Sequence, residues 1–242
     1  MSLITRRSML ATGAVTLAAA GSVHAQEREA FRPAPTKDGF TTLTADEALQ
    51  FLIDGNDAFL AGVNTSPPIG PQRRLELAKG QAPFCAYVTC SDSRVPPELL
   101  FGRGLGELFI IRNAGNTVGT AAMGSIEYAV AVLKVPLVVI MGHEACGAVD
   151  AARKVVEEDA RFPGAIDDMI HPILPAVLGA RDKNGKIDLD RAIHENVRRT
   201  VQRLRKESDP ILLDPQKRGS VKIVGAYYDL DRGKVDFFDR PS

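Results

Sequence analysis

The stretch LVVIMGHEACG, residues 137–147, decides the fold of this chain. Residues 137–141 are a continuous apolar run of strand length, without the polar alternation of a strand that has one wet face. Such a strand is typical of a parallel sheet that helices cover on both sides. His143 and Cys146 follow directly, and both are metal-ligating residue types. We expect a site here because ligands in such sheets gather beyond the carboxyl ends of the strands.

Outward from this stretch, apolar runs of strand length alternate with helical patterns. The chain therefore predicts an α/β fold with a mostly parallel central sheet flanked by helices, and an edge hairpin at the C-terminus, joined at residues 231–234. The expected strands are residues 84–90, 107–112, 137–141 and 220–229, and the expected helices are residues 118–133, 148–158 and 190–206, with another around 72–79. A further helix opens after Thr44, which forms a capping box with Glu47.

The 242 residues suffice for one well-buried domain, which we expect over residues 44–242. Residues 26–43 read as a linker or an N-terminal arm, a candidate to reach a partner subunit. Residues 1–25 carry Arg6-Arg7, a modestly apolar run, and a small-residue cleavage pattern near Ala25. Adjacent arginines resemble a twin-arginine signal, so the protein is expected to be periplasmic or otherwise exported.

Composition argues against several classes of partner. Lys plus Arg and Asp plus Glu number 30 each, so no bulk charge points to nucleic acid. Beyond the signal, no segment is long and apolar enough to span a bilayer, and no membrane association is expected after cleavage. Three cysteines are an odd number for a compartment that oxidises pairs. Cys85 is expected to be a buried small hydrophobe, which leaves Cys90 and Cys146 for a metal.

Cys90 ends the strand at residues 84–90, and His143 follows the strand at residues 137–141. Two thiolates and an imidazole are a usual Zn²⁺ ligand set, and three protein ligands leave a fourth position open. The side chains of His143 and Cys146 share one face if a helical turn begins at Gly142. Gly142 and Gly147 are expected to let the backbone approach the metal closely. The pattern predicts a catalytic zinc site.

Asp92 and Arg94 follow Cys90 and offer two arrangements. The Asp92 carboxylate can reach the metal as a fourth ligand, which closes the site. It can instead form a bidentate pair with the Arg94 guanidinium, which leaves room for a water of lowered pKa. A plain structural salt bridge beside a turn is the third reading of this dyad.

These motifs resemble the β-class carbonic anhydrases over roughly residues 44–240. The matching segments are residues 55–59, 90–98, 108–116, 125–130, 142–149 and 225–230. The resemblance implies a lyase in which Cys90, His143 and Cys146 hold Zn²⁺ and hydroxide on the zinc attacks CO₂ to give bicarbonate and a proton. Asp92 and Arg94 would gate the fourth position.

The resemblance also assigns substrate contacts. Gln81 matches a glutamine that hydrogen-bonds the substrate, and Phe109 and Tyr128 match apolar pocket residues that can come from a partner subunit. A homodimer or homotetramer is implied. Some relatives carry a non-catalytic bicarbonate pocket around a Trp three residues before the first Cys ligand. This chain has Tyr87 there and no Trp.

Two alternatives remain at this stage. The same zinc could hydrolyse COS or CS₂, which are linear, apolar analogues of CO₂. The chain could also be a non-catalytic zinc module that Asp92 keeps closed, although such a module needs neither Gln81 nor Arg94. No histidine stands out as a proton shuttle, since His171 and His194 fall outside the motifs.

Overall fold

A computed structural model describes residues 31–63 and 66–241 of the chain. The strands are β1 (Thr36–Lys37), β2 (Phe40–Thr41), β3 (Cys85–Thr89), β4 (Leu108–Arg112), β5 (Leu137–His143), β6 (Lys222–Tyr228) and β7 (Val235–Asp239). The main sheet has the order β4-β3-β5-β6-β7. The first four of these strands are parallel, and β7 pairs antiparallel with β6. The expected α/β fold with a C-terminal edge hairpin is confirmed.

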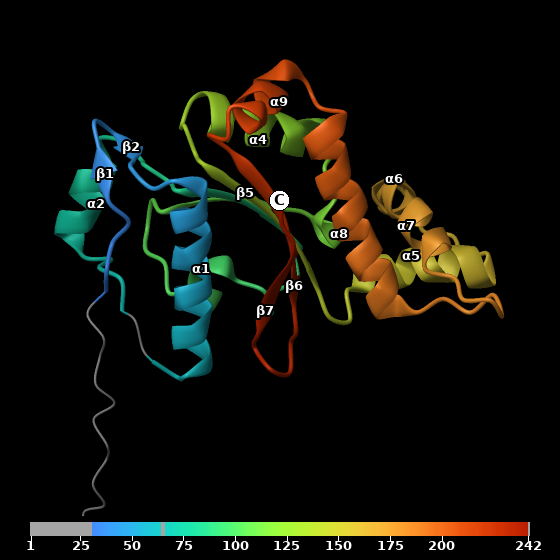
Figure 1. Ribbon diagram of the computed structural model, residues 1–242. Coiled ribbons are helices and arrows are strands. Elements are labelled where there is room, and N and C mark those ends of the chain that lie inside the picture. The colour runs from blue at the N-terminus through green and yellow to red at the C-terminus, as the bar shows by residue number, and fades with distance from the viewer. Residues whose placement is uncertain (1–30, 64–65, 242) are drawn as a thin grey trace, which may run out of the picture.

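Helices lie on both faces of the sheet (Figure 1). They are α1 (Ala45–Leu60), α2 (Pro71–Leu77), α3 (Pro97–Leu100), α4 (Thr120–Ala131), α5 (Gly147–Glu158), α6 (Ala165–Ile170), α7 (Leu174–Gly179), α8 (Leu189–Lys206) and α9 (Pro210–Lys217), with 3-10 turns η1 (Ala114–Asn116) and η2 (His171–Ile173). The long helices match the sequence expectations within about two residues. The short helices α3, α6, α7 and α9 were not expected, because one or two turns leave no periodic pattern to detect.

The sheet separates two apolar clusters. One contains Leu52 of α1 and Val149 of α5, and the other contains Ile126 of α4 and Val201 of α8. Every residue of β3 and β5 is buried. Burial on both faces explains why these strands read as continuous apolar runs, because neither face alternates with polar residues.

Helix α1 begins with the predicted capping box. The Glu47 N–H donates to the Thr44 hydroxyl at 3.3 Å, and the Thr44 N–H donates to the Glu47 carboxylate at 2.8 Å. Further along, a Cβ on Gly55 would lie 2.2 Å from the backbone oxygen of Phe101, so only glycine permits this approach. The buried Asn56 side chain then accepts from the Val235 N–H at 2.9 Å, which ties α1 to the C-terminal hairpin.

The described part of the N-terminal arm contacts its own chain. The Ala34 N–H donates to the buried Glu107 carboxylate at 2.6 Å, and the Arg103 guanidinium donates to the Arg32 carbonyl at 3.3 Å. The predicted signal at residues 1–25 and the first part of the arm lie outside the described residues. Among the described helices, none has both the length and the hydropathy that crossing a bilayer requires.

Candidate metal centre

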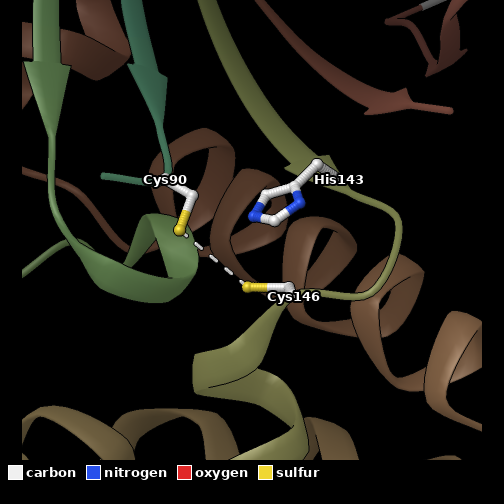
Figure 2. A group of neighbouring side chains, drawn as sticks. All are labelled: Cys90, His143 and Cys146. Carbon is white, nitrogen blue, oxygen red and sulfur yellow. Dashed lines mark hydrogen bonds between the residues drawn. The ribbon is translucent and has the colours of Figure 1, made fainter. Parts of the chain in front are cut away.

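The pairing of β3 with β5 brings the candidate ligands together. The two strands run parallel, with Cys85 opposite Leu137, so their carboxyl ends meet at one edge of the sheet. Cys90 follows β3, His143 is the last residue of β5, and Cys146 precedes α5. The Cys90 and Cys146 sulfurs lie 4.0 Å apart, and one ligand atom from each of the three residues lies within 4.8 Å of the others (Figure 2).

No helical turn begins at Gly142, so the condition under which His143 and Cys146 would share one helix face is not met. β5 continues through His143, because Gly142 and His143 stay in register with Tyr227 and Tyr228 of β6. Ala145 then takes a left-handed φ of 51°, and Cys146 is the N-cap residue of α5. The two ligands therefore converge from a strand end and a helix start rather than from one face of a helix.

Gly142 has a packing role that the sequence did not indicate. A Cβ on Gly142 would lie 2.8 Å from Ile193 and 2.9 Å from Val197, so this glycine lets α8 pack against β5. A Cβ on Gly147 would meet no protein atom within 4 Å. The approach of the backbone to a metal at these two glycines stays a prediction.

The His143 ring is oriented to present one nitrogen to the cluster. Its Nδ1 lies 2.8 Å from the Glu144 carbonyl oxygen, a contact that makes Nδ1 the protonated nitrogen. The other nitrogen, Nε2, is buried and has no hydrogen-bond partner among the described residues. Leaving a buried polar atom unpaired costs about 1–3 kcal/mol, so the arrangement fits a metal ligand.

The Cys90 sulfur has two polar contacts. It lies 4.0 Å from the Cys146 sulfur and accepts from the Gly115 N–H at 3.4 Å, and these contacts lower the pKa of Cys90. The contact with Cys90 and burial raise the pKa of Cys146. Burial alone raises the pKa of Cys85, whose sulfur belongs to the apolar core as predicted.

Two sulfurs and an imidazole nitrogen are a soft donor set that suits Zn²⁺. Cys90, His143 and Cys146 are all buried. The Asp92 side chain, which is 19% exposed, lies beside them, with Oδ2 3.9 Å from His143 Nε2. The residues thus fit a metal ion with three protein ligands.

Asp92 adopts the second of its two expected arrangements. Arg94 Nε donates to Oδ1 at 2.9 Å and Nη2 donates to Oδ2 at 2.8 Å, and the Arg94 backbone N–H adds a third bond of 3.0 Å to Oδ1. The Arg94 guanidinium holds the pKa of Asp92 well below its usual range, so the carboxylate is ionised at neutral pH.

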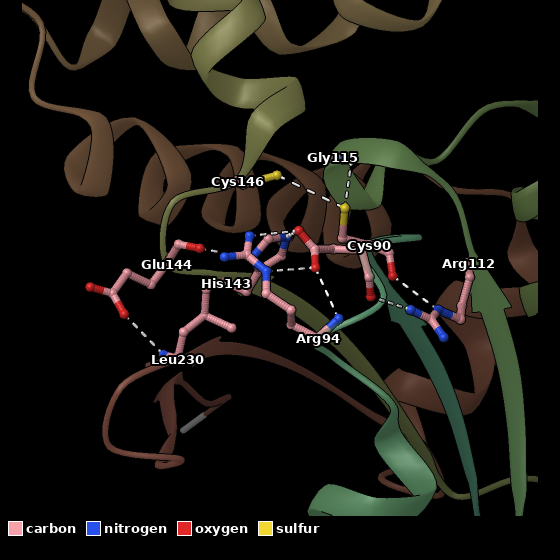
Figure 3. Close-up of polar contacts among 9 residues, drawn as sticks. Cys90, Arg94, Arg112, Gly115, His143, Glu144, Cys146 and Leu230 are labelled. Atoms are coloured by element: carbon pink, nitrogen blue, oxygen red, sulfur yellow. Dashed lines mark hydrogen bonds and ion pairs between the residues drawn. The ribbon is translucent and has the colours of Figure 1, made fainter.

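Arg112 holds the backbone of this site, a role that no sequence pattern indicated. Its guanidinium donates to the Cys90 carbonyl at 3.0 Å and to the Asp92 carbonyl at 2.5 Å (Figure 3). Arg112 is the last residue of β4, which pairs with β3, and this position at a strand end was the one feature of the sequence that could have indicated its role.

Tyr87, at the position where some relatives carry a Trp, is fully buried, and its hydroxyl donates to Met141 Sδ at 2.8 Å.

The expected substrate contacts are not brought to the cluster within one chain. Gln81 precedes β3, whose length of roughly 16 Å at ~3.3 Å per residue separates it from Cys90. It lines an open groove of about 590 Å³ beside the N-terminal arm. Phe109 of β4 packs on the apolar cluster that the sheet separates from Cys90, and the ring of Tyr128 in α4 packs against Phe109, with centroids 6.1 Å apart.

The fold and the cluster together define an α/β metalloenzyme with a Cys-His-Cys centre. Comparison with known proteins agrees. The sequence model of the carbonic anhydrase family matches residues 85–235. Carbonic anhydrase 2 of Mycobacterium tuberculosis is 40% identical over 191 residues, covering 78% of this chain and 90% of that protein. The carbonic anhydrase of Mycolicibacterium smegmatis is 40% identical over 189 residues, covering 78% and 91%.

A solved β-carbonic anhydrase from Sordaria macrospora, described as tetrameric, superposes with a TM-score of 0.64 at 27% identity, covering 80% of this chain and 98% of that one. The chain therefore belongs to the β-class carbonic anhydrase family. Enzymes of this family interconvert CO₂ and bicarbonate.

Alkylation of the metal-free protein tests the thiol assignment. Cys90 should react with iodoacetamide first, and its rate should persist down to pH 6 because its pKa is lowered from the usual ~8.5. Cys85 should stay unmodified, and added Zn²⁺ should protect Cys90 and Cys146. Peptide mass mapping reads out each site, and denatured protein is the control in which all three cysteines react. Equal labelling of Cys85 and Cys90 would contradict the assignment.

Proposed function

We propose that this protein is a zinc enzyme that hydrates CO₂ reversibly to bicarbonate and a proton. The observation that carries the proposal is the convergence of Cys90, His143 and Cys146, with the ion pair of Asp92 and Arg94 beside them. Zn²⁺ held by the three ligands would lower the pKa of a water molecule toward ~7 and so supply a nucleophile at neutral pH.

The remaining chemistry belongs to the side chains. The Asp92 carboxylate is ionised, so it can accept a hydrogen bond and orient the attacking water beside His143. Arg94 donates two hydrogen bonds to Oδ1 and one to Oδ2 of Asp92, which holds the carboxylate in this position and leaves Oδ2 able to accept another. The Arg94 side chain is 53% exposed, so the dyad connects the buried cluster with solvent, where the proton leaves.

The dyad also supplies a gate. While Arg94 holds Asp92, the carboxylate is kept from the ligand cluster. Breaking this pair would free the Asp92 carboxylate, whose Oδ2 already lies 3.9 Å from His143 Nε2, to turn toward the metal, complete the ligand set and exclude water. The fixed contacts of Arg112 with the carbonyls of Cys90 and Asp92 support a movement confined to the Asp92 side chain.

Asp92→Ala tests both functions of the dyad. Turnover of CO₂ in stopped-flow measurements should fall at least about 100-fold, the lower range for loss of a proton-handling group. Zinc content should stay at that of the unmodified protein, because the three ligands remain. His171→Ala, which removes an exposed imidazole paired with Asp167, is the matched control and should keep its activity. Full activity of Asp92→Ala would overturn the proposal for the gate.

The same experiment separates the alternatives. Unmodified, zinc-loaded protein that turns over COS but not CO₂ would favour the hydrolase. Loaded protein inactive toward both would favour the non-catalytic module.

We further propose a homodimer or homotetramer in which Gln81, Phe109 and Tyr128 serve the site of another copy. Strand β4 is an edge of the described sheet, with hydrogen-bonding groups unpaired on one side. Tyr128 beside it is 48% exposed, and Leu99 and Leu105 are exposed as well, which favours a covered surface.

Sedimentation equilibrium tests the assembly. The unmodified protein should have at least twice the mass of one chain. Tyr128→Glu, which puts a charge on the proposed contact, should shift the mass toward that of one chain, and Arg161→Glu on an exposed loop is the control. A monomeric unmodified protein would refute the proposal.

We also propose export to the periplasm by a twin-arginine signal. The support is the pair Arg6-Arg7, the apolar run after it and the cleavage pattern near Ala25. Replacing both arginines by lysine preserves the charge, so only receptor recognition should be lost. Cell fractionation should find the unmodified protein in the periplasm, beginning near Gln26. The Arg6→Lys/Arg7→Lys variant should stay in the cytoplasm as uncleaved precursor. Equal export of both would exclude this signal.

A further inference from the structure

Asn196 is a polar residue on the apolar side of α8. Its neighbours Ala192, Ile193 and Val197 are all buried, and Asn196 itself is 5% exposed. A buried amide costs free energy unless it is hydrogen-bonded. Its Nδ2 donates to the carbonyl oxygen of Gly115 at 3.0 Å, a buried contact between residues 81 positions apart in the chain.

Gly115 stands between this bond and the Cys90 sulfur. The carbonyl on one side of its Cα accepts from Asn196, and the N–H on the other side donates to Cys90 Sγ at 3.4 Å (Figure 3). Only the two dihedral angles of Gly115 separate these groups. Its φ of 68° and ψ of 20° lie in the left-handed region, so a bond that fixes the carbonyl also fixes the direction of the N–H.

The packing around Gly115 has no room for a side chain. A Cβ at this position would lie 2.6 Å from Ile173 and 3.2 Å from Ala148. The absence of a side chain, however, also leaves the backbone with more conformational freedom than any other residue has. A hydrogen bond from outside the turn is therefore needed to hold it, and Asn196 makes that bond.

We infer that Asn196 is a positioning residue of the metal centre: through Gly115 it directs a backbone N–H at the Cys90 sulfur. An N–H bonded to a thiolate stabilises the charge that metal binding requires and fixes the direction of the sulfur lone pairs. The inference rests on the proposed function, since it assumes that Cys90 is a ligand. It adds α8, a helix that carries none of the three ligands, to the metal site.

Truncation at Asn196 leaves the fold intact enough to test. Asn196 lines an open cavity of about 300 Å³, together with Thr117, Arg199 and Thr200, so Asn196→Ala enlarges a space in contact with solvent instead of creating a sealed void. Thr200→Val is the matched control. It lies on the same helix and the same cavity, and the hydroxyl that it removes donates only to the backbone carbonyl of Asn196.

The experiment measures Zn²⁺ affinity by competition with a chelator, using the purified full chain. Asn196→Ala should bind Zn²⁺ about tenfold more weakly, the lower end of the range for residues that support a metal ligand. In the Co²⁺-loaded variant, the near-ultraviolet charge-transfer band between the thiolates and Co²⁺ should shift in wavelength relative to the unmodified protein. Thr200→Val should match the unmodified protein in both measurements. Asn196→Ser, whose side chain is too short to reach Gly115, should reproduce the effect if Asn196→Ala does not fold.

Zn²⁺ affinity and Co²⁺ absorption unchanged in a folded Asn196 variant would overturn the inference. An equal loss in Thr200→Val would also overturn it, because the effect would then come from the cavity and not from the bond to Gly115. An unmodified protein that binds no Zn²⁺ would refute the proposed function instead, so the two failures are distinguishable.

Discussion

The parallel pairing of β3 with β5 is the constraint on which the rest of the structure depends. It sets Cys90 and His143 at the same edge of the sheet, although 53 residues separate them in the chain. The turn after β5 then returns Cys146 to the same point, 4.0 Å from the other sulfur. A shift in the register of these strands would separate the ligands, because each is fixed to the end of a buried strand or the start of a helix.

Around this point, hydrogen bonds from other elements orient His143 and Cys90. His143 Nδ1 contacts the Glu144 carbonyl, the Cys90 sulfur accepts from Gly115, and Arg112 holds the Cys90 carbonyl. The supporting groups come from the loop after β5, the turn η1 and the end of β4. Because the supporting groups come from several elements, the ligands can stay ordered while Asp92 beside them keeps an exposed partner, Arg94.

The metal ligands and the expected substrate contacts lie in different parts of the chain. The metal cluster is complete within one chain, since all three ligand atoms meet there. The expected substrate contacts are not: Gln81 lies at the opposite end of β3, and Phe109 and Tyr128 lie on the other side of the sheet. One chain can therefore hold the metal, whereas the proposed substrate pocket requires a second copy.

The amino-acid sequence alone determined the parallel sheet, the capping box at Thr44 and the three candidate ligands, because burial on both faces, helix capping and metal ligation each need particular residue types at short spacing. Tertiary structure alone decided the course of the turn at Gly142, where pairing with Tyr227 and Tyr228 prolongs β5. It alone decided which partner Asp92 takes. It alone revealed Arg112 and Asn196, because hydrogen bonds across 22 and 81 residues leave no local pattern in a chain.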